Sequence, residues 1–204
     1  ARHFEDRSEF LIEPGAIDPR EVCLTLDATV PSDIGLIIGS GASSGFTTML
    51  CNRPRSMVLA SKFYGCIGQM LPAAMGAIVA TGNKPTFLVD GDASFMMHLQ
   101  DWDTAVRYNI PLLAVVLNDQ ALGSEYHKMR AHNLKAELST IPTPDLGEVG
   151  RAFGGRGCLA RSAEEVRAAA AEWVAKPGPM IIDARISRNV ETLSMRRTLH
   201  AKDE

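Results

Sequence analysis

The sequence predicts an α/β fold, a doubly wound and mostly parallel six-stranded sheet with helices on both faces. Short apolar runs that end at Gly, Ser, Asp or Asn alternate with longer stretches of helical period, which is typical of a parallel sheet covered on both sides. With 204 residues, 46% of them hydrophobic, the chain is long enough for one substantial core and short for two domains. We therefore expect a single domain over residues 1–186, followed over residues 187–204 by a polar tail or an arm that docks on a neighbour.

The apolar runs and the helical periods give the expected elements. Six strands are predicted, at residues 34–38, 57–60, 86–90, 112–117, 156–160 and 180–186. Seven helices are predicted, at residues 19–29, 44–51, 66–80, 95–108, 121–132, 145–153 and 163–175. Their ends carry recognisable signals: Pro19 follows Asp18 as a first-turn residue after a cap, and Ser162 and Glu165 form the pattern of a capping box.

Composition and charge argue against several classes of protein. A net charge of −3, with lysines and arginines scattered along the chain, predicts neither a nucleic-acid partner nor an anionic membrane. The four cysteines are widely spaced without a C-x-x-C pair, which favours small buried hydrophobes in a reducing compartment over a zinc site. No apolar run reaches the length of a bilayer span, and the first residues are charged where a signal peptide would be apolar, so we expect a cytoplasmic protein.

Polar groups follow the third and fourth expected strands, at the sheet edge where ligands bind in open parallel sheets. The two sets are Gly91, Asp92, Ala93 and Ser94, and then Asp119, Ala121, Leu122 and Gly123. A magnesium ion bound to a diphosphate needs few protein ligands, so Asp92, Asp119 and one backbone carbonyl would be enough. Each motif alone is more often an ordinary turn with a helix cap. The pair favours a site, because each follows an apolar strand directly and a crossover helix separates them.

The run Gly91-Asp92-Ala93-Ser94-Phe95, continuing to Asn118-Asp119, resembles a family signature. The signature consists of Gly-Asp-Gly, followed some two dozen residues later by Asn-Asn. It is typical of thiamine-diphosphate-dependent enzymes of the acetolactate synthase and 2-oxo acid decarboxylase family. The next residues, Gln-Ala-Leu-Gly, are similar to the stretch after the signature in acetolactate synthases. The resemblance implies that Asp92, Asp119 and the backbone carbonyl of Ala121 hold Mg²⁺ beside the cofactor's diphosphate. This chain departs from the signature at two positions, where Ala93 replaces a Gly and Asp119 replaces an Asn. Aspartate is a competent magnesium ligand.

Residues 65–77 carry the most specific match in the chain. They end in Leu-Pro-Ala-Ala-Met-Gly-Ala and look like the family's run that ends in Leu-Pro-Ala-Ala-x-Gly-Ala. The resemblance implies that Ile67 supports the bent V shape of the cofactor, that the carbonyl of Gly65 accepts from its aminopyrimidine, and that Cys66 lies beside it. Without the signature, Ile67 would be interpreted as a core residue at a helix start.

A third loop, residues 39–45, follows the first strand and opens a helix, so its amides and hydroxyls are placed to bind phosphate. It lacks the spacing of a Rossmann fingerprint, and no acid ends the second strand. By position, Gly41, Ala42 and Ser43 resemble the family's first diphosphate loop, although acetolactate synthases have Gln and His where this chain has Ala42 and Ser43.

The helix after Asp119 contacts the substrate in relatives, which makes Glu125 and His127 candidates for that role. The alternative is a solvated helix face without a function.

The resemblance implies the C-terminal, diphosphate-binding domain of a transferase or lyase that acts on small 2-oxo acids by decarboxylation or carboligation. A pyrimidine-binding domain or subunit has to supply an activating glutamate, so we expect a homo- or hetero-oligomer and no turnover by this chain alone. We also expect an exposed apolar face around Ile67, Met70 and the helix that follows. The alternatives are the small subunit of a two-subunit decarboxylase, similar to sulfopyruvate or phosphonopyruvate decarboxylase, and a non-catalytic α/β domain that binds a nucleotide.

Overall fold

One six-stranded sheet organises the computed structural model, which describes residues 6–60 and 64–200. The strand order is β2-β1-β3-β4-β6-β5, and every neighbouring pair is parallel. The strands are β1 (Gly35–Ile38), β2 (Val58–Ala60), β3 (Thr86–Gly91), β4 (Leu112–Asn118), β5 (Arg156–Ala160) and β6 (Met180–Arg185). All six predicted strands are present, each within one residue of its predicted ends, and the predicted α/β fold is confirmed.

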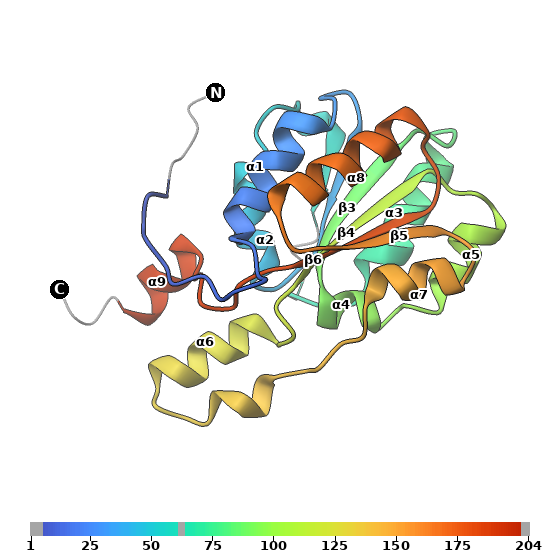
Figure 1. Ribbon diagram of the computed structural model, residues 1–204. Helices are drawn as coiled ribbons and strands as arrows, with labels where there is room; N and C mark the ends of the chain where they lie inside the picture. Colours follow the sequence, from blue (N-terminus) through green and yellow to red (C-terminus); the bar gives the residue numbers. More distant parts are fainter. Residues whose placement is uncertain (1–5, 61–63, 201–204) are drawn as a thin grey trace.

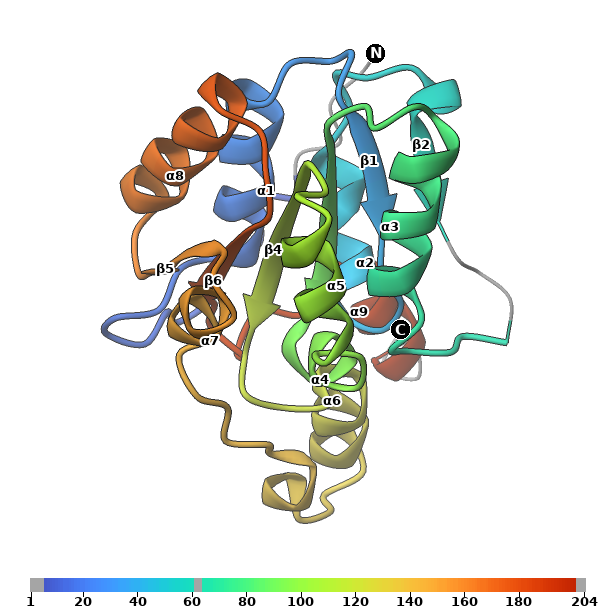
Figure 2. The ribbon, with the colours of Figure 1, turned by 90° about the vertical axis from the view of Figure 1, so that its right-hand side faces the viewer.

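Helices cover both faces of this sheet (Figures 1 and 2). One face carries α1 (Pro19–Thr29), α2 (Ser43–Phe46), the 3-10 helix η1 (Thr47–Met49) and α8 (Ala163–Ala175). The other carries α3 (Met70–Ala80), α4 (Asp92–Met96), α5 (Asp101–Arg107) and α7 (Leu146–Ala152). Consecutive strand residues alternate between two cores, so that Val89 belongs to the same core as Trp173, and Leu88 to the same core as Trp102.

The remaining helices lie at the periphery. Helix α6 (Gly123–Ala131), the 3-10 helix η3 (Ala136–Ser139) and α9 (Leu193–Leu199) lie beyond the carboxyl ends of the central strands, whereas the 3-10 helix η2 (Arg55–Met57) leads into β2 (Figure 2). None of the helices in the described ranges is long and apolar enough to cross a bilayer.

The predicted capping signals act as expected. The side chain of Asp18 accepts from the amide of Arg20 at 2.8 Å, and Pro19 is the first helical residue of α1. Both hydrogen bonds of the capping box between Ser162 and Glu165 are present at the start of α8. The starts of these two helices, which pack against each other, are therefore set by their own sequences.

Three helix predictions were wrong in detail. The helix expected over residues 44–51 is the four-residue α2 followed by the 3-10 helix η1, which ends at Met49. The helix expected from residue 66 begins at Met70, because Gly65 and Gly68 adopt φ of 63° and 92°, in the left-handed region that no helix continues through. The helix expected over residues 95–108 is two helices, α4 and α5. Between them, the amides of His98 and Leu99 bond to carbonyls only three residues back, which tightens the backbone into a turn.

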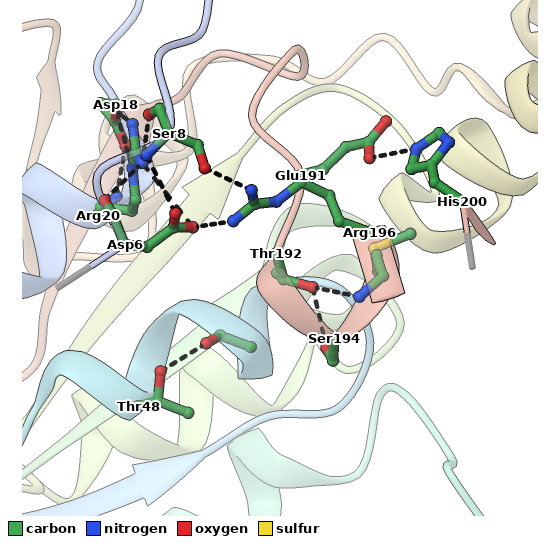
Figure 3. Close-up of polar contacts among 12 residues, drawn as sticks. Asp6, Ser8, Asp18, Arg20, Thr48, Glu191, Thr192, Ser194, Arg196 and His200 are labelled. Atoms are coloured by element: carbon green, nitrogen blue, oxygen red, sulfur yellow. Dashed lines mark hydrogen bonds and ion pairs between the residues drawn. The ribbon is translucent and has the colours of Figure 1, made fainter. Parts of the chain in front are cut away.

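The segment after β6, predicted as polar, packs on the domain. Ser187, Val190 and Thr192 are buried, and Thr192 caps α9 by accepting from the amide of Met195 at 3.2 Å. Figure 3 shows how Arg196 of α9 reaches the N-terminal segment, where it binds Asp6 and Ser8. This polar segment therefore finds partners for its charges at the other end of the chain.

The cysteines depart from the expectation of four buried hydrophobes. All four are free, but only Cys23 is buried; Cys66 is exposed, and Cys51 and Cys158 are half-buried.

Candidate cofactor and metal site

Four loops meet in one cavity at the carboxyl ends of the three neighbouring strands β1, β3 and β4. It contains every predicted site residue except Gly65, Cys66 and His127. The lining residues are Ser40, Gly41, Ala42, Ser43, Phe46, Ile67, Gly91, Asp92, Ala93, Ser94, Leu117, Asp119, Ala121, Leu122, Gly123, Ser124, Glu125 and Ile186. Loops that lie far apart in the sequence are thus brought together by the parallel sheet, as the sequence predicted.

Two carboxylates dominate the electrostatics of this cavity. Asp92 is the first residue of α4 and only 1% exposed, and its Oδ2 has no hydrogen-bond partner among the described residues. Burial, and then the charge of Asp119, raise the pKa of Asp92 to about 8. Burial also raises the pKa of Asp119 to about 6, against the opposing effects of the Ala121 amide, which donates to Oδ1 at 3.0 Å, and of Arg188. A divalent cation would stabilise the ionised form of these two carboxylates, which repel each other in a buried environment.

The loops approach one another closely at Gly123. A Cβ on Gly123 would lie 2.6 Å from Oδ2 of Asp119 and 3.2 Å from Cβ of Ala42. The loop after β1 is equally near to the other loops: a Cβ on Gly91 would lie 3.6 Å from Oγ of Ser43, and one on Gly41 would lie 3.7 Å from Cγ2 of Ile67. The predicted metal, diphosphate and cofactor-shaping loops therefore touch one another.

The donor set fits a hard cation that arrives with its own oxygen ligands. Within the described residues there is no group of three or more His, Cys, Asp or Glu side chains that could hold a metal ion. Asp92 and Asp119 are two oxygen donors, and magnesium completes its octahedron from backbone carbonyls, phosphate oxygens and water. Such a cation would give Oδ2 of Asp92, which is buried without a hydrogen-bond partner among the described residues, a positive charge to bind.

A hydrogen-bonded chain that the sequence analysis missed ties two of the loops together. Asp90 is 1% exposed, and its carboxylate accepts from the hydroxyl of Ser94 at 2.7 Å and from the amide of Gly91 at 2.9 Å. The same Ser94 oxygen accepts from the amide of Gly68 at 2.8 Å, next to Ile67. Burial raises the pKa of Asp90 to about 6, although both of its hydrogen bonds oppose the rise. An acid inside an otherwise apolar strand was the available signal, because such a group must find partners.

A family model, described as the C-terminal TPP-binding domain of thiamine pyrophosphate enzymes, matches residues 38–184. The chain belongs to this family. It is 30% identical over 195 residues to the acetolactate synthase large subunit of Parasynechococcus marenigrum, covering 91% of this chain and 31% of that protein. It is also 30% identical over 192 residues to a probable chloroplastic acetolactate synthase 2 of Oryza sativa subsp. japonica, with coverages of 88% and 29%.

A solved structure agrees on the fold. The thiamine diphosphate-dependent 4-hydroxybenzoylformate decarboxylase of Rhodococcus jostii RHA1 superposes with a TM-score of 0.78 at 22% identity, covering 90% of this chain and 35% of the decarboxylase. The predicted family is thus confirmed as the TPP-binding domain of acetolactate synthase-like enzymes, and the chain spans less than a third of the length of the acetolactate synthases that it matches.

Three predicted site residues lie outside the cavity of this TPP-binding domain. Gly65 and Cys66 are exposed on the loop before α3 and do not line the cavity, although the neighbouring Ile67 does. His127 is 3% exposed and lies inside, with Nδ1 3.4 Å from Oε1 of Glu191, and burial lowers its pKa. Glu125, by contrast, lines the cavity and pairs with Lys128 at 3.2 Å.

The expected apolar face is only partly present on the TPP-binding domain. Met70 is 3% exposed, so its predicted exposure was wrong: it belongs to the core beneath α3. Ile67 is half-buried, and Val79 and Met97 are exposed by 61% and 54%.

Proposed function

We propose that this domain binds the diphosphate of thiamine diphosphate together with Mg²⁺ and forms half of the active site of an acetolactate synthase-like enzyme. The observation that carries the proposal is the meeting of Asp92 and Asp119 in one cavity, with an oxygen of Asp92 unpartnered and buried. Family membership supports the cofactor, and the two carboxylates support the metal.

In this proposal one set of loop residues binds the metal ion and a second set binds the diphosphate. Asp92, Asp119 and the backbone carbonyl of Ala121 hold Mg²⁺. The small residues around them leave room for the diphosphate oxygens to approach backbone amides and hydroxyls. This second set comprises Gly41, Ala42, Ser43, Gly91, Ala93, Ser94, Leu122 and Gly123.

The remaining predicted residues would act on the rest of the cofactor and on the substrate. Ile67, which lies beside Gly41, would support the bend of the cofactor, with the carbonyl of Gly65 beyond it as acceptor for the aminopyrimidine and Cys66 alongside. Glu125 at the cavity wall would face a small 2-oxo acid. When bound, thiamine diphosphate supplies the electron sink for decarboxylation or carboligation, whereas the protein supplies position and charge.

A partner completes the site in this proposal. A pyrimidine-binding domain, in the same chain or in another subunit of an oligomer, would supply the activating glutamate. The share of the acetolactate synthases that this chain spans, less than a third, leaves room for such a domain in a relative.

Calorimetry tests the proposed binding. The chain is titrated with thiamine diphosphate in Mg²⁺, with thiamine diphosphate in EDTA, and with MgADP; heat is expected in the first titration alone. Asp92→Asn should weaken the binding about tenfold or more, equivalent to ~1.4 kcal/mol. Asp103→Asn is the matched control, because Asp103 is an exposed acid of α5 that pairs with Arg107 at 2.6 Å, away from the cavity. Preference for MgADP, or equal binding by Asp92→Asn, would refute the proposal.

A further inference from the structure

The turn that carries Asp119 into α6 is held from outside the cavity. Gln120 adopts φ of 57°, in the left-handed region, which a residue with a side chain occupies only when its surroundings enforce it. The carbonyl of Asp119, which precedes this residue, accepts two hydrogen bonds from Arg188, from Nε at 3.0 Å and from Nη2 at 2.7 Å. Both ends of the guanidinium fork thus fix one peptide plane of the metal loop.

Arg188 is itself rigidly placed. It follows β6, where the amide of Ile186 donates to the carbonyl of Asn118 at 3.0 Å and the amide of Ser187 donates to the carbonyl of Ile17 at 2.8 Å. Its guanidinium lies over the ring of Tyr126, 5.6 Å from the centroid, and the chain just beyond is anchored by the buried Val190. Arg188 therefore fixes the residue after β4, Asp119, relative to the end of β6.

The same segment also touches the loop that follows β1. A Cβ on Gly45 of α2 would lie 2.5 Å from Cγ2 of Thr192, so Thr192 packs directly on that helix. Farther on, Arg196 fastens α9 to Asp6 and Ser8 (Figure 3). Residues 187–199 thus contact two of the loops that line the cavity.

We propose that Arg188 is a positioning residue of the metal site. It holds the peptide between Asp119 and Gln120 so that the carboxylate of Asp119 and the carbonyl of Ala121 face the cation together. This inference rests on the proposed function, because it concerns the geometry of the proposed magnesium ligands. Arg188 itself does not line the cavity that contains Asp92 and Asp119.

The test compares Arg188→Ala with Arg161→Ala. Arg161 is a matched control. Both arginines line a second cavity, of about 520 Å³, but Arg161 donates to the carbonyl of Gly15, at 2.9 Å, and not to the carbonyl of Asp119. The measured quantity is the Mg²⁺ concentration that gives half-maximal thiamine diphosphate binding. We expect it to rise about tenfold in Arg188→Ala, because the turn that carries Asp119 is no longer held, and to stay unchanged in Arg161→Ala.

Two further measurements separate positioning from general stability. Arg188→Lys should recover part of the loss, and guanidinium ion at low concentration should do the same for Arg188→Ala, because the hollow beside Asp119 is open. Hydrogen exchange of the Ala121 and Leu122 amides, measured without any cofactor, should be faster in Arg188→Ala only.

Equal magnesium dependence in Arg188→Ala and the parent, or unchanged exchange of these amides, would overturn the role of Arg188. Should the parent chain bind no thiamine diphosphate, the proposed function would fail, and the amide exchange would still decide whether Arg188 holds the turn.

Discussion

Replacement of Asp92 by Asn is expected to stabilise the cofactor-free domain, by an amount that grows with pH. Burial and the neighbouring carboxylate of Asp119 raise the pKa of Asp92 from 3.8 to about 8 on folding. An acid whose pKa is raised in the folded state contributes its full stability below the unfolded pKa and loses it as the pH rises through the folded pKa. Asparagine has nearly the same shape and carries no charge, so it escapes this loss.

The size of the effect depends on how far the pH of the measurement lies above the unfolded pKa of Asp92. At pH 7 the folded domain keeps on Asp92 a proton that the unfolded chain has released, about three pH units above the unfolded pKa. At ~1.4 kcal/mol per unit, the variant gains as much as roughly 4 kcal/mol in its free energy of unfolding at pH 7. Below about pH 3 both states hold the proton, and the gain disappears.

Urea unfolding in EDTA at pH 5 and pH 7 measures this difference. The advantage of Asp92→Asn over the parent should be about 3 kcal/mol larger at pH 7 than at pH 5. Asp103→Asn is the matched control, because Asp103 pairs with Arg107 on the surface of α5 and does not line the cavity that contains Asp92. Saturating Mg²⁺ and thiamine diphosphate should reduce the advantage by ~1.4 kcal/mol or more, since the parent is expected to bind them about tenfold or more tightly. An Asn variant less stable than its parent at pH 7, or with an advantage independent of pH, would refute the reasoning.

Three other substitutions or assays probe the same site. Asp119→Asn should keep magnesium-dependent binding of thiamine diphosphate in calorimetry because an amide oxygen still coordinates, whereas Asp119→Ala should lose it; equal behaviour of the two variants would exclude Asp119 as a ligand. Gly123→Ala should weaken that binding about tenfold, since its Cβ would lie 2.6 Å from Oδ2 of Asp119, whereas Gly76→Ala on α3, where a Cβ meets nothing within 4 Å, should bind as the parent does. The chain alone should release no CO₂ from pyruvate, and addition of a pyrimidine-binding domain should restore turnover; activity without it would show that the glutamate is dispensable.

The sequence predicted the elements and the meeting of Asp92 with Asp119 because both depend on local patterns. Apolar runs define buried parallel strands, and the carboxyl ends of neighbouring strands share an edge. Contacts between distant segments left no such pattern. The burial of His127 depends on the segment around Glu191, and the partners of Asp90 depend on how closely the loop at Gly68 approaches β3.

Rigidity explains why the domain keeps two carboxylates so close. All seven residues of β4 are buried, and β3 pairs with it through six registered positions up to Gly91, so the two strand ends that carry Asp92 and Asp119 cannot move apart to relieve their repulsion. The unfavourable electrostatics are instead relieved by protonation or by a cation. Binding of a divalent ion should therefore release protons near neutral pH and stabilise the fold at the same time, because both effects arise from the same pair of charges.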